Sequence, residues 1–150
     1  MEKRLRLLGI GIVILASFAV ARRTVLAADY AALDRGQLKN IHLALLIYAE
    51  DHEGFLPPNL AVVAKDYPAN LFISPKNHKS EVKWNATTFK PDYVYLGAGL
   101  RFPEGSFGEI GNVPLMYTRI SQAWSNVLFL DGRVEGYTRE QSERLVESKK

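Results

Sequence analysis

The chain contains no cysteine and three histidines, and this scarcity narrows the chemistry that it can perform. Without cysteine there is no disulfide, no thiolate nucleophile and no thiolate metal ligand. The histidines, His42, His52 and His78, lie in stretches that supply none of them with the partners of a catalytic triad or of a metal site. We therefore expect a protein that is not an enzyme and that needs no cofactor.

A surplus of basic residues is also missing from most of the chain. The net charge is +3, but residues 1–23 hold five of the 19 Lys and Arg and one of the 16 Asp and Glu. Residues 24–150 therefore carry 14 basic and 15 acidic residues. A protein that follows a phosphate backbone needs a concentrated positive surface. We expect no nucleic-acid partner.

What the sequence does contain is a long uncharged stretch near its start. Residues 7–21 carry no charge and follow a basic segment, and adding Leu5 and Arg6 gives 17 residues. As a helix they span about 26 Å at ~1.5 Å per residue, slightly less than the ~30 Å of bilayer hydrocarbon. The side chains of Arg6 and Arg22 can reach the headgroups. The residues expected to contact lipid and neighbouring subunits are Leu7, Leu8, Ile10, Ile12, Val13, Ile14, Leu15 and Phe18.

This stretch predicts a membrane segment over residues 1–23 and a head over residues 24–150. The balance of basic residues favours a cytoplasmic N-terminus, so the head would lie on the opposite side of the membrane. A cleaved signal peptide is the alternative, because Ala19-Val20-Ala21 supply a small-residue cleavage site. Arg22 and Arg23 follow at once, and positive charge there opposes translocation.

A second helical pattern follows the uncharged stretch. Its apolar positions are Leu38, Ile41, Leu45 and Tyr48, which share one helix face, and Asp34 interrupts the pattern. Gly36 is the one glycine between positions 11 and 54, and no proline lies there. The glycine at position 54, which can adopt the left-handed C′ conformation, precedes two prolines and predicts the helix end. We expect one helix of nearly fifty residues, with its second half packed on the head.

The rest of the head alternates short elements with turns. Asn59 is expected to cap a short helix that ends before Pro68. Strands are expected over residues 92–96 and 113–118, with a glycine-rich loop over residues 97–111 between them. These elements predict an α+β fold in which the long helix packs on a small antiparallel sheet.

The clearest local pattern lies near the C-terminus. Two runs of strand-forming residues flank Asp131-Gly132, and a two-residue Asp-Gly loop predicts a hairpin with a type I′ turn. Thr138 and Gln141 have the spacing of a capping box. They predict a short C-terminal helix.

Two segments carry a resemblance to a known family. Residues 37–58 look like the helix end of the pseudopilin-like, prepilin-type proteins of type II secretion that are abundant in Planctomycetes and Verrucomicrobia. Residues 126–135, which include Asp131 and Gly132, resemble the C-terminal signature of the same proteins, in which a histidine precedes Asp-Gly by nine intervening residues. The resemblance implies a pilin-like fold and a subunit that assembles with other pilin-like subunits or secretion-system components.

The chain departs from the family pattern at several positions. Gly9 is followed by Ile10 and not by an aromatic residue, and Ile14 stands where prepilins carry glutamate. Ser121 takes the place of the signature histidine, and Ser74 that of a cysteine before proline. Processing by a prepilin peptidase and the charge pairing of pilin-like filaments therefore do not follow from the resemblance.

An acidic cluster is a candidate cation site. Glu50, Asp51 and Glu53 lie in the last turn of the expected helix, where negative charge opposes the helix dipole. Calcium prefers such oxygen ligands. Asp131 is a further candidate, because the resemblance implies calcium binding near the C-terminus. A solvated helix end and a turn-forming aspartate are the simpler interpretations.

Taken together, the sequence predicts a membrane-anchored structural or assembly subunit without catalysis. The resemblance implies that it belongs to a type II secretion or type IV pilus-like system, in the bacterial inner membrane with its head in the periplasm or outside the cell. Its expected partners are membrane lipid and other subunits. One alternative is a periplasmic binding module freed by signal-peptide cleavage. Another is a small secreted hydrolase, for which no nucleophile and base occur in a recognisable context.

Overall fold

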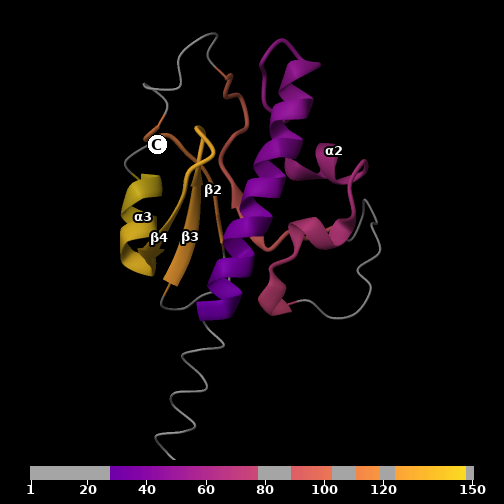
Figure 1. Cartoon of the computed structure of the whole chain (residues 1–150). Helices are drawn as coiled ribbons and strands as arrows, with labels where there is room; N and C mark the ends of the chain where they lie inside the picture. Colours follow the sequence, from indigo (N-terminus) through magenta and orange to yellow (C-terminus); the bar gives the residue numbers. More distant parts are fainter. Residues whose placement is uncertain (1–27, 78–88, 103–110, 119–123, 148–150) are drawn as a thin grey trace, which may run out of the picture. The chain divides into compact units, whose positions relative to one another are not determined.

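A computed structural model describes residues 28–77, 89–102, 111–118 and 124–147 (Figure 1). The chain divides into two compact units, Met1–Ala32 and Leu33–Lys150. Of the first unit, the structure describes the helical residues 28–32, so the expected membrane segment and its boundary with the head lie outside the described residues. None of the helices that the structure describes is long and apolar enough to cross a membrane.

The first described element is a long helix over residues 28–50. The predicted left-handed residue at its end, Gly54, is present, but it is not the first left-handed residue after the helix. Gly54 is left-handed, with φ +84°, and donates its N–H to the carbonyl of Ala49 at 2.8 Å, as in a Schellman motif. The preceding residue, Glu53, is also left-handed, with φ +55°. The first left-handed position after the helix is therefore Glu53, one residue earlier than predicted.

Four strands form one antiparallel sheet in the order β1-β2-β3-β4. Both predicted strands in the middle of the chain are present, each shorter than the predicted range by one or two residues. In the register, Tyr95 lies opposite Met116, and Val127 lies between Tyr117 and Glu135. The strands are β1 (Tyr93–Tyr95), β2 (Pro114–Thr118), β3 (Trp124–Phe129) and β4 (Val134–Thr138).

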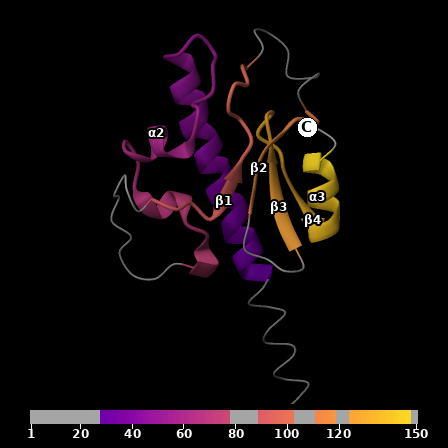
Figure 2. The ribbon, with the colours of Figure 1, turned by 180° about the vertical axis from the view of Figure 1, so that it is seen from behind.

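Helices cover both faces of this sheet (Figures 1 and 2). Residues 33–50 of the long helix pack on one face, where Leu38 and Leu45 meet Met116 and Leu128 in the core. The C-terminal helix α3 (Arg139–Glu147) packs against β2, β3 and β4 on the other face. The predicted α+β architecture, a helix on a small antiparallel sheet with a short C-terminal helix, is confirmed.

The capping box that starts α3 has the predicted hydrogen bonds. The Thr138 N–H donates to Gln141 Oε1 at 2.9 Å, and the Gln141 N–H donates to Thr138 Oγ1 at 3.3 Å. Two otherwise unpaired amides at the helix start are satisfied in this way.

Short elements connect the long helix to β1. Helix α2 (Leu60–Ala64) has the predicted cap, since Asn59 Oδ1 accepts from the Val62 N–H at 3.3 Å. Two 3₁₀ turns follow, η1 (Ala69–Phe72) and η2 (Pro75–Asn77). The long helix holds the first of them through the Gln37 amide, whose nitrogen lies 2.6–2.8 Å from three backbone carbonyls, those of Asn70, Leu71 and Ile73.

The β3–β4 hairpin is present, but its turn is not of type I′. The Gly132 N–H donates to the Phe129 carbonyl at 3.0 Å, and the Phe129 N–H donates to the Arg133 carbonyl at 2.9 Å. Three residues, Leu130 to Gly132, thus form the loop, and of Asp131 and Gly132 the glycine alone has positive φ, +85°. This is the pattern of a type I turn followed by a glycine bulge.

Tertiary contacts explain why the loop takes a third residue. The Leu130 N–H donates to the Val113 carbonyl at 2.8 Å, and the Leu130 side chain is buried in the core. Leu130 is therefore hydrogen-bonded to the segment that leads into β2 while it already forms part of the turn. In a two-residue loop of Asp131 and Gly132, the Leu130 N–H would face Arg133 and could not also donate to Val113.

Candidate functional site

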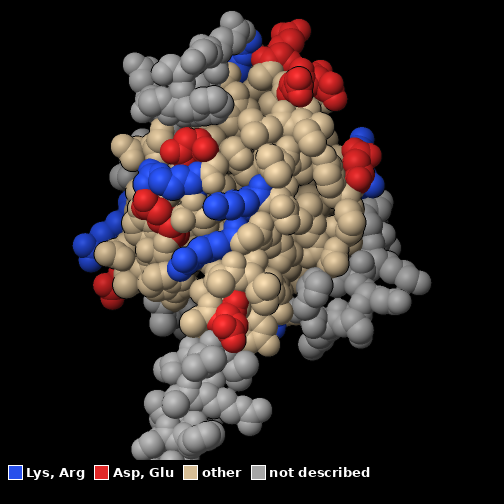
Figure 3. All heavy atoms as spheres, viewed as in Figure 1, with Lys and Arg blue, Asp and Glu red and all other residues tan. Residues whose placement is uncertain are grey.

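The face of the long helix turned away from the sheet exposes large apolar side chains. Leu33, Leu43 and Ile47 are 60%, 57% and 53% exposed. Positions 43 and 47 are one helical turn apart, and position 33 lies further along the same side. In Figure 3, basic side chains cross the middle of the visible face, and uncharged surface extends to one side of them. A soluble helix usually presents charged residues on its outer side, so this exposed apolar face is a candidate contact surface.

The opposite face of the same helix carries the residues predicted to pack against the head. Leu38, Ile41 and Leu45 are completely buried, and Tyr48 is half-buried at the edge of the core. Each fully buried aliphatic side chain contributes about 1.5–3 kcal/mol to folding. The helix is therefore apolar on both sides, with one side used by the head.

Asp34, which interrupts the apolar pattern in the sequence, is the centre of a buried hydrogen-bond network. Asp34 is 4% exposed, and its carboxylate contacts one residue from each of three strands. Tyr93 Oη donates to Oδ1 at 3.0 Å, while Thr118 Oγ1 and Asn126 Nδ2 donate to Oδ2 at 2.6 and 2.8 Å. A buried carboxylate is tolerated only when such donors surround it.

The network perturbs the ionisation of its phenol. Burial raises the pKa of Tyr93 far above its usual range, and the negative charge of Asp34 raises it further. Asn126 is held in turn by Arg35 Nε and Trp124 Nε1, which approach its Oδ1 at 3.3 and 3.4 Å. Sequence reasoning did not identify this network, although a carboxylate on the apolar face of a helix was a signal that buried partners exist.

His42 forms a further polar contact between the long helix and the hairpin. Its side chain is buried, and Nε2 lies 3.0 Å from the Leu130 carbonyl. Because a carbonyl can only accept, Nε2 carries the proton. A Cβ added to Gly132 would lie 2.9 Å from His42 Cε1, and the Phe102 ring packs edge-on at 5.9 Å. The Asp-Gly turn of the signature segment is thus shaped to fit this imidazole.

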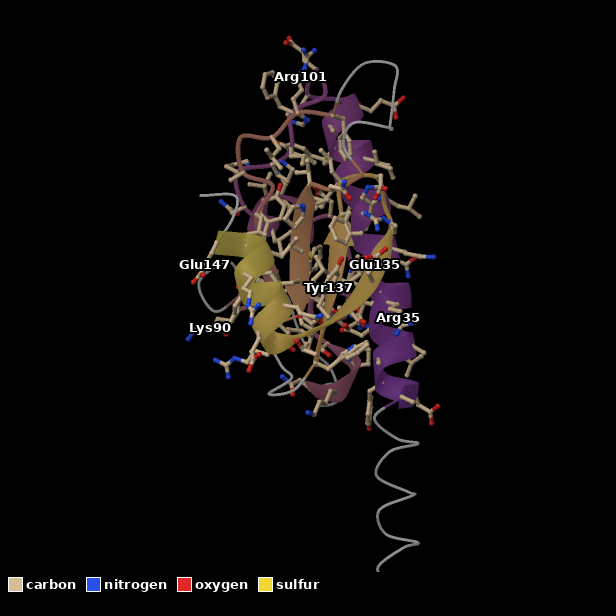
Figure 4. All side chains as sticks on the ribbon, turned by 90° about the vertical axis from the view of Figure 1, so that its left-hand side faces the viewer. Arg35, Lys90, Arg101, Glu135, Tyr137 and Glu147 are labelled. Atoms are coloured by element: carbon tan, nitrogen blue, oxygen red, sulfur yellow. The ribbon has the colours of Figure 1, made fainter. Side chains whose placement is uncertain are left out.

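Asp131 uses its carboxylate within the hairpin. Oδ1 accepts from the Arg133 N–H at 3.0 Å, and Oδ2 lies 3.6 Å from Arg133 Nε. The Arg133 guanidinium also pairs with Glu135, and Tyr137 Oη donates to the same carboxylate at 2.7 Å (Figure 4). The hydrogen bond from Tyr137, together with Arg133, lowers the pKa of Glu135. These contacts are typical of a rigid turn.

The acidic cluster at the end of the long helix is exposed. Glu50, Asp51 and Glu53 lie at the surface, where Figure 3 shows acidic side chains gathered at one end of the visible face. Within the part of the chain that the structure describes, no three His, Asp or Glu side chains come together as a metal site. The carbonyl of Glu53 accepts from Arg101 Nε at 2.6 Å, which ties the end of the helix to the glycine-rich loop.

Several predicted site residues lie outside the described residues. They are the expected lipid and subunit contacts Leu7, Leu8, Ile10, Ile12, Val13, Ile14, Leu15 and Phe18, together with His78 and Ser121. No protein-family model matches the chain, and neither the curated proteins nor the solved structures contain a match.

Proposed function

We propose that this chain is a membrane-anchored, pilin-like assembly subunit without catalytic activity. In this proposal residues 1–23 anchor the chain in the bacterial inner membrane, and the head displays the exposed face of the long helix to neighbouring subunits. The neighbours would be other pilin-like subunits or components of a type II secretion or type IV pilus-like system. The observation that carries the proposal is a helix with apolar residues on two opposite sides.

Burial on one side explains only half of this pattern. Leu38, Ile41 and Leu45 fill the core, whereas Leu43 and Ile47 lie on the surface at 57% and 53% exposure. Two large aliphatic side chains one turn apart are costly to leave in water, at about 25 cal/mol per Å² of apolar surface. Burial of this face against another subunit would recover that free energy. The uncharged stretch over residues 7–21 supplies the expected anchor.

The first experiment determines the mature N-terminus and the location of the intact chain. Membranes from expressing cells are washed with carbonate at high pH, and the protein is analysed by intact mass. We expect the chain in the membrane pellet with the uncharged stretch retained. A soluble product shortened by about 21 residues, after cleavage behind Ala21, would overturn the anchor and favour the periplasmic binding module.

The second experiment tests the exposed face directly. Leu43→Glu with Ile47→Glu should abolish crosslinking of the full-length chain to its neighbours in the membrane, while the thermal midpoint stays within a few degrees. Lys65→Glu is the control, because this exposed residue caps α2 and is not part of the long helix. Unchanged crosslinking in the double variant would contradict the proposal.

A further inference from the structure

The apolar pattern of the long helix does not by itself define how the helix is aligned on the sheet. Its buried residues recur every three or four positions, at Leu38, Ile41, Leu45 and Ala49. A shift by four residues toward the C-terminal end of the helix, about 6 Å, would place Ile41 where Leu45 lies and Leu45 where Ala49 lies. These two residues would again meet apolar sites, whereas Leu38 would take the place of the buried His42. The packing of the second half of the stripe alone therefore discriminates weakly between the two alignments.

Two buried polar residues, in contrast, strongly favour the observed alignment of the helix over a shifted one. Asp34 bonds to Asn126 in β3, and His42 bonds to the Leu130 carbonyl just after the same strand. Asp34 and His42 are eight residues apart, about 12 Å along a helix. Asn126 and Leu130 are four residues apart, about 13 Å along an extended chain. The two spacings agree, so both bonds form together in one alignment.

A shift would break both bonds at once. Moved by four residues in this direction, Asp34 would lie where Leu38 lies, and Tyr93, Thr118 and Asn126 would lose their acceptor. The carboxylate itself would leave its three donors. A buried polar group without a partner costs far more than the difference between two apolar packings. Buried polar groups are known to define register in helical assemblies.

We propose that Asp34 and His42 form a two-point register lock that holds the long helix in one axial position on the sheet. The lock acts inside the second unit and does not depend on the membrane anchor. Any partner that pulls or pushes on this helix then moves the sheet with it.

Engineered cysteines test the lock against a background free of native cysteine. Gln37→Cys with Asn70→Cys reports the native alignment, because the Gln37 amide nitrogen lies 2.6 Å from the Asn70 carbonyl. Leu33→Cys with Asn70→Cys reports a helix shifted by four residues. Initial rates of disulfide formation are measured for both pairs in the full-length chain. With the lock intact, the pair at positions 33 and 70 should react at least ten times more slowly than the native pair.

The same pairs are then placed in an Asp34→Leu, His42→Leu background. We expect the relative rate of the shifted pair to rise at least tenfold, and the amide NMR spectrum to show doubled peaks for the long helix and β3. Lys39→Leu with Asn40→Leu is the control, because it adds two leucines at exposed positions of the same helix. A folded double-leucine variant with the wild-type rate ratio and a single set of peaks would overturn the lock.

If the double-leucine variant does not fold, two milder substitutions test the lock in its place. Asp34→Asn keeps the size of the side chain but turns an amide group toward the Asn126 amide, and His42→Gln shortens the reach to Leu130. In this pair of substitutions a rise in the relative rate of the shifted pair supports the lock. An unchanged ratio refutes it.

Discussion

The His42 imidazole donates from Nε2 to the Leu130 carbonyl at 3.0 Å, across 88 residues of sequence. This bond places the other side of the ring against the backbone of Gly132. The Asp-Gly turn is therefore part of the contact between helix and hairpin as well as the end of a strand pair. Its glycine serves two purposes: it allows a positive φ and it leaves room for the ring.

Gly132→Ala separates these two purposes. The variant must adopt φ near +85° with a Cβ and must also displace the His42 ring, whose Cε1 lies 2.9 Å from the added atom. We expect a loss of about 3 kcal/mol in the free energy of unfolding by urea. Gly99→Ala is the control, since Gly99 has φ +78° and no atom within 4 Å of an added Cβ. It should lose about 1 kcal/mol, and equal losses in the two variants would refute the steric contact.

Glu53→Gly should stabilise the protein. Glu53 is a non-glycine residue with φ +55° that also places negative charge at the end of a helix. Relief of both effects should raise the free energy of unfolding by about 1 kcal/mol. Glu53→Gln removes the charge and keeps the backbone strain, so its gain should be about 0.3 kcal/mol. A glutamine variant as stable as the glycine variant would show that charge alone matters.

The raised pKa of Tyr93 predicts how the stability of the protein changes at alkaline pH. Below its ordinary pKa of ~10 the phenol is protonated in both the folded and the unfolded states, so its contribution is fully present. Above that pH the unfolded chain ionises while the folded chain, whose Tyr93 pKa is raised by burial and by Asp34, keeps its proton. Stability therefore falls with rising pH, by about 1.4 kcal/mol per pH unit for this residue.

Tyr93→Phe gives the corresponding measurement. Near pH 8 the variant should be less stable by about 1–2 kcal/mol, because Asp34 loses a donor. Above pH 10 its urea-derived free energy should fall less steeply than that of the wild type, by the slope of one tyrosine. Parallel slopes in the two proteins would show that Tyr93 ionises as readily in the folded state as in the unfolded state.

Gly136→Ala should destabilise the protein although alanine normally suits a strand better than glycine. An added Cβ would lie 1.9 Å from Trp124 Cζ2, so the indole would have to leave its position across β4. We expect a loss of about 1–3 kcal/mol. Gly36→Ala on the long helix, where an added Cβ meets nothing within 4 Å, should instead gain up to about 1 kcal/mol. Thermal unfolding of both variants distinguishes these opposite signs.

Local patterns predicted most of the elements correctly. The Asn59 cap and the Thr138–Gln141 capping box depend on residues three positions apart, and both have the expected hydrogen bonds. The buried stripe of the long helix follows from its 3.6-residue period. Interactions within one helical turn or one strand involve residues that are close in the sequence, so the sequence pattern is enough to predict them.

Features that depend on distant residues were predicted less well. The turn at Asp131-Gly132 has a three-residue loop because Leu130 is bonded to Val113 and His42, and neither partner is near it in the sequence. Asp34 was recognised only as an interruption of the apolar stripe. Its donors lie 59, 84 and 92 residues away, on three strands whose order the sequence alone does not reveal.

Those separations also affect how the chain folds. The Asp34 network closes only when the helix and three strands have met, and contacts across such long stretches form late because each closes a large loop. Loss of the network should therefore leave the rate of folding nearly unchanged and speed up unfolding. The carboxylate that interrupts the apolar stripe would then determine how long the native head persists once it has formed.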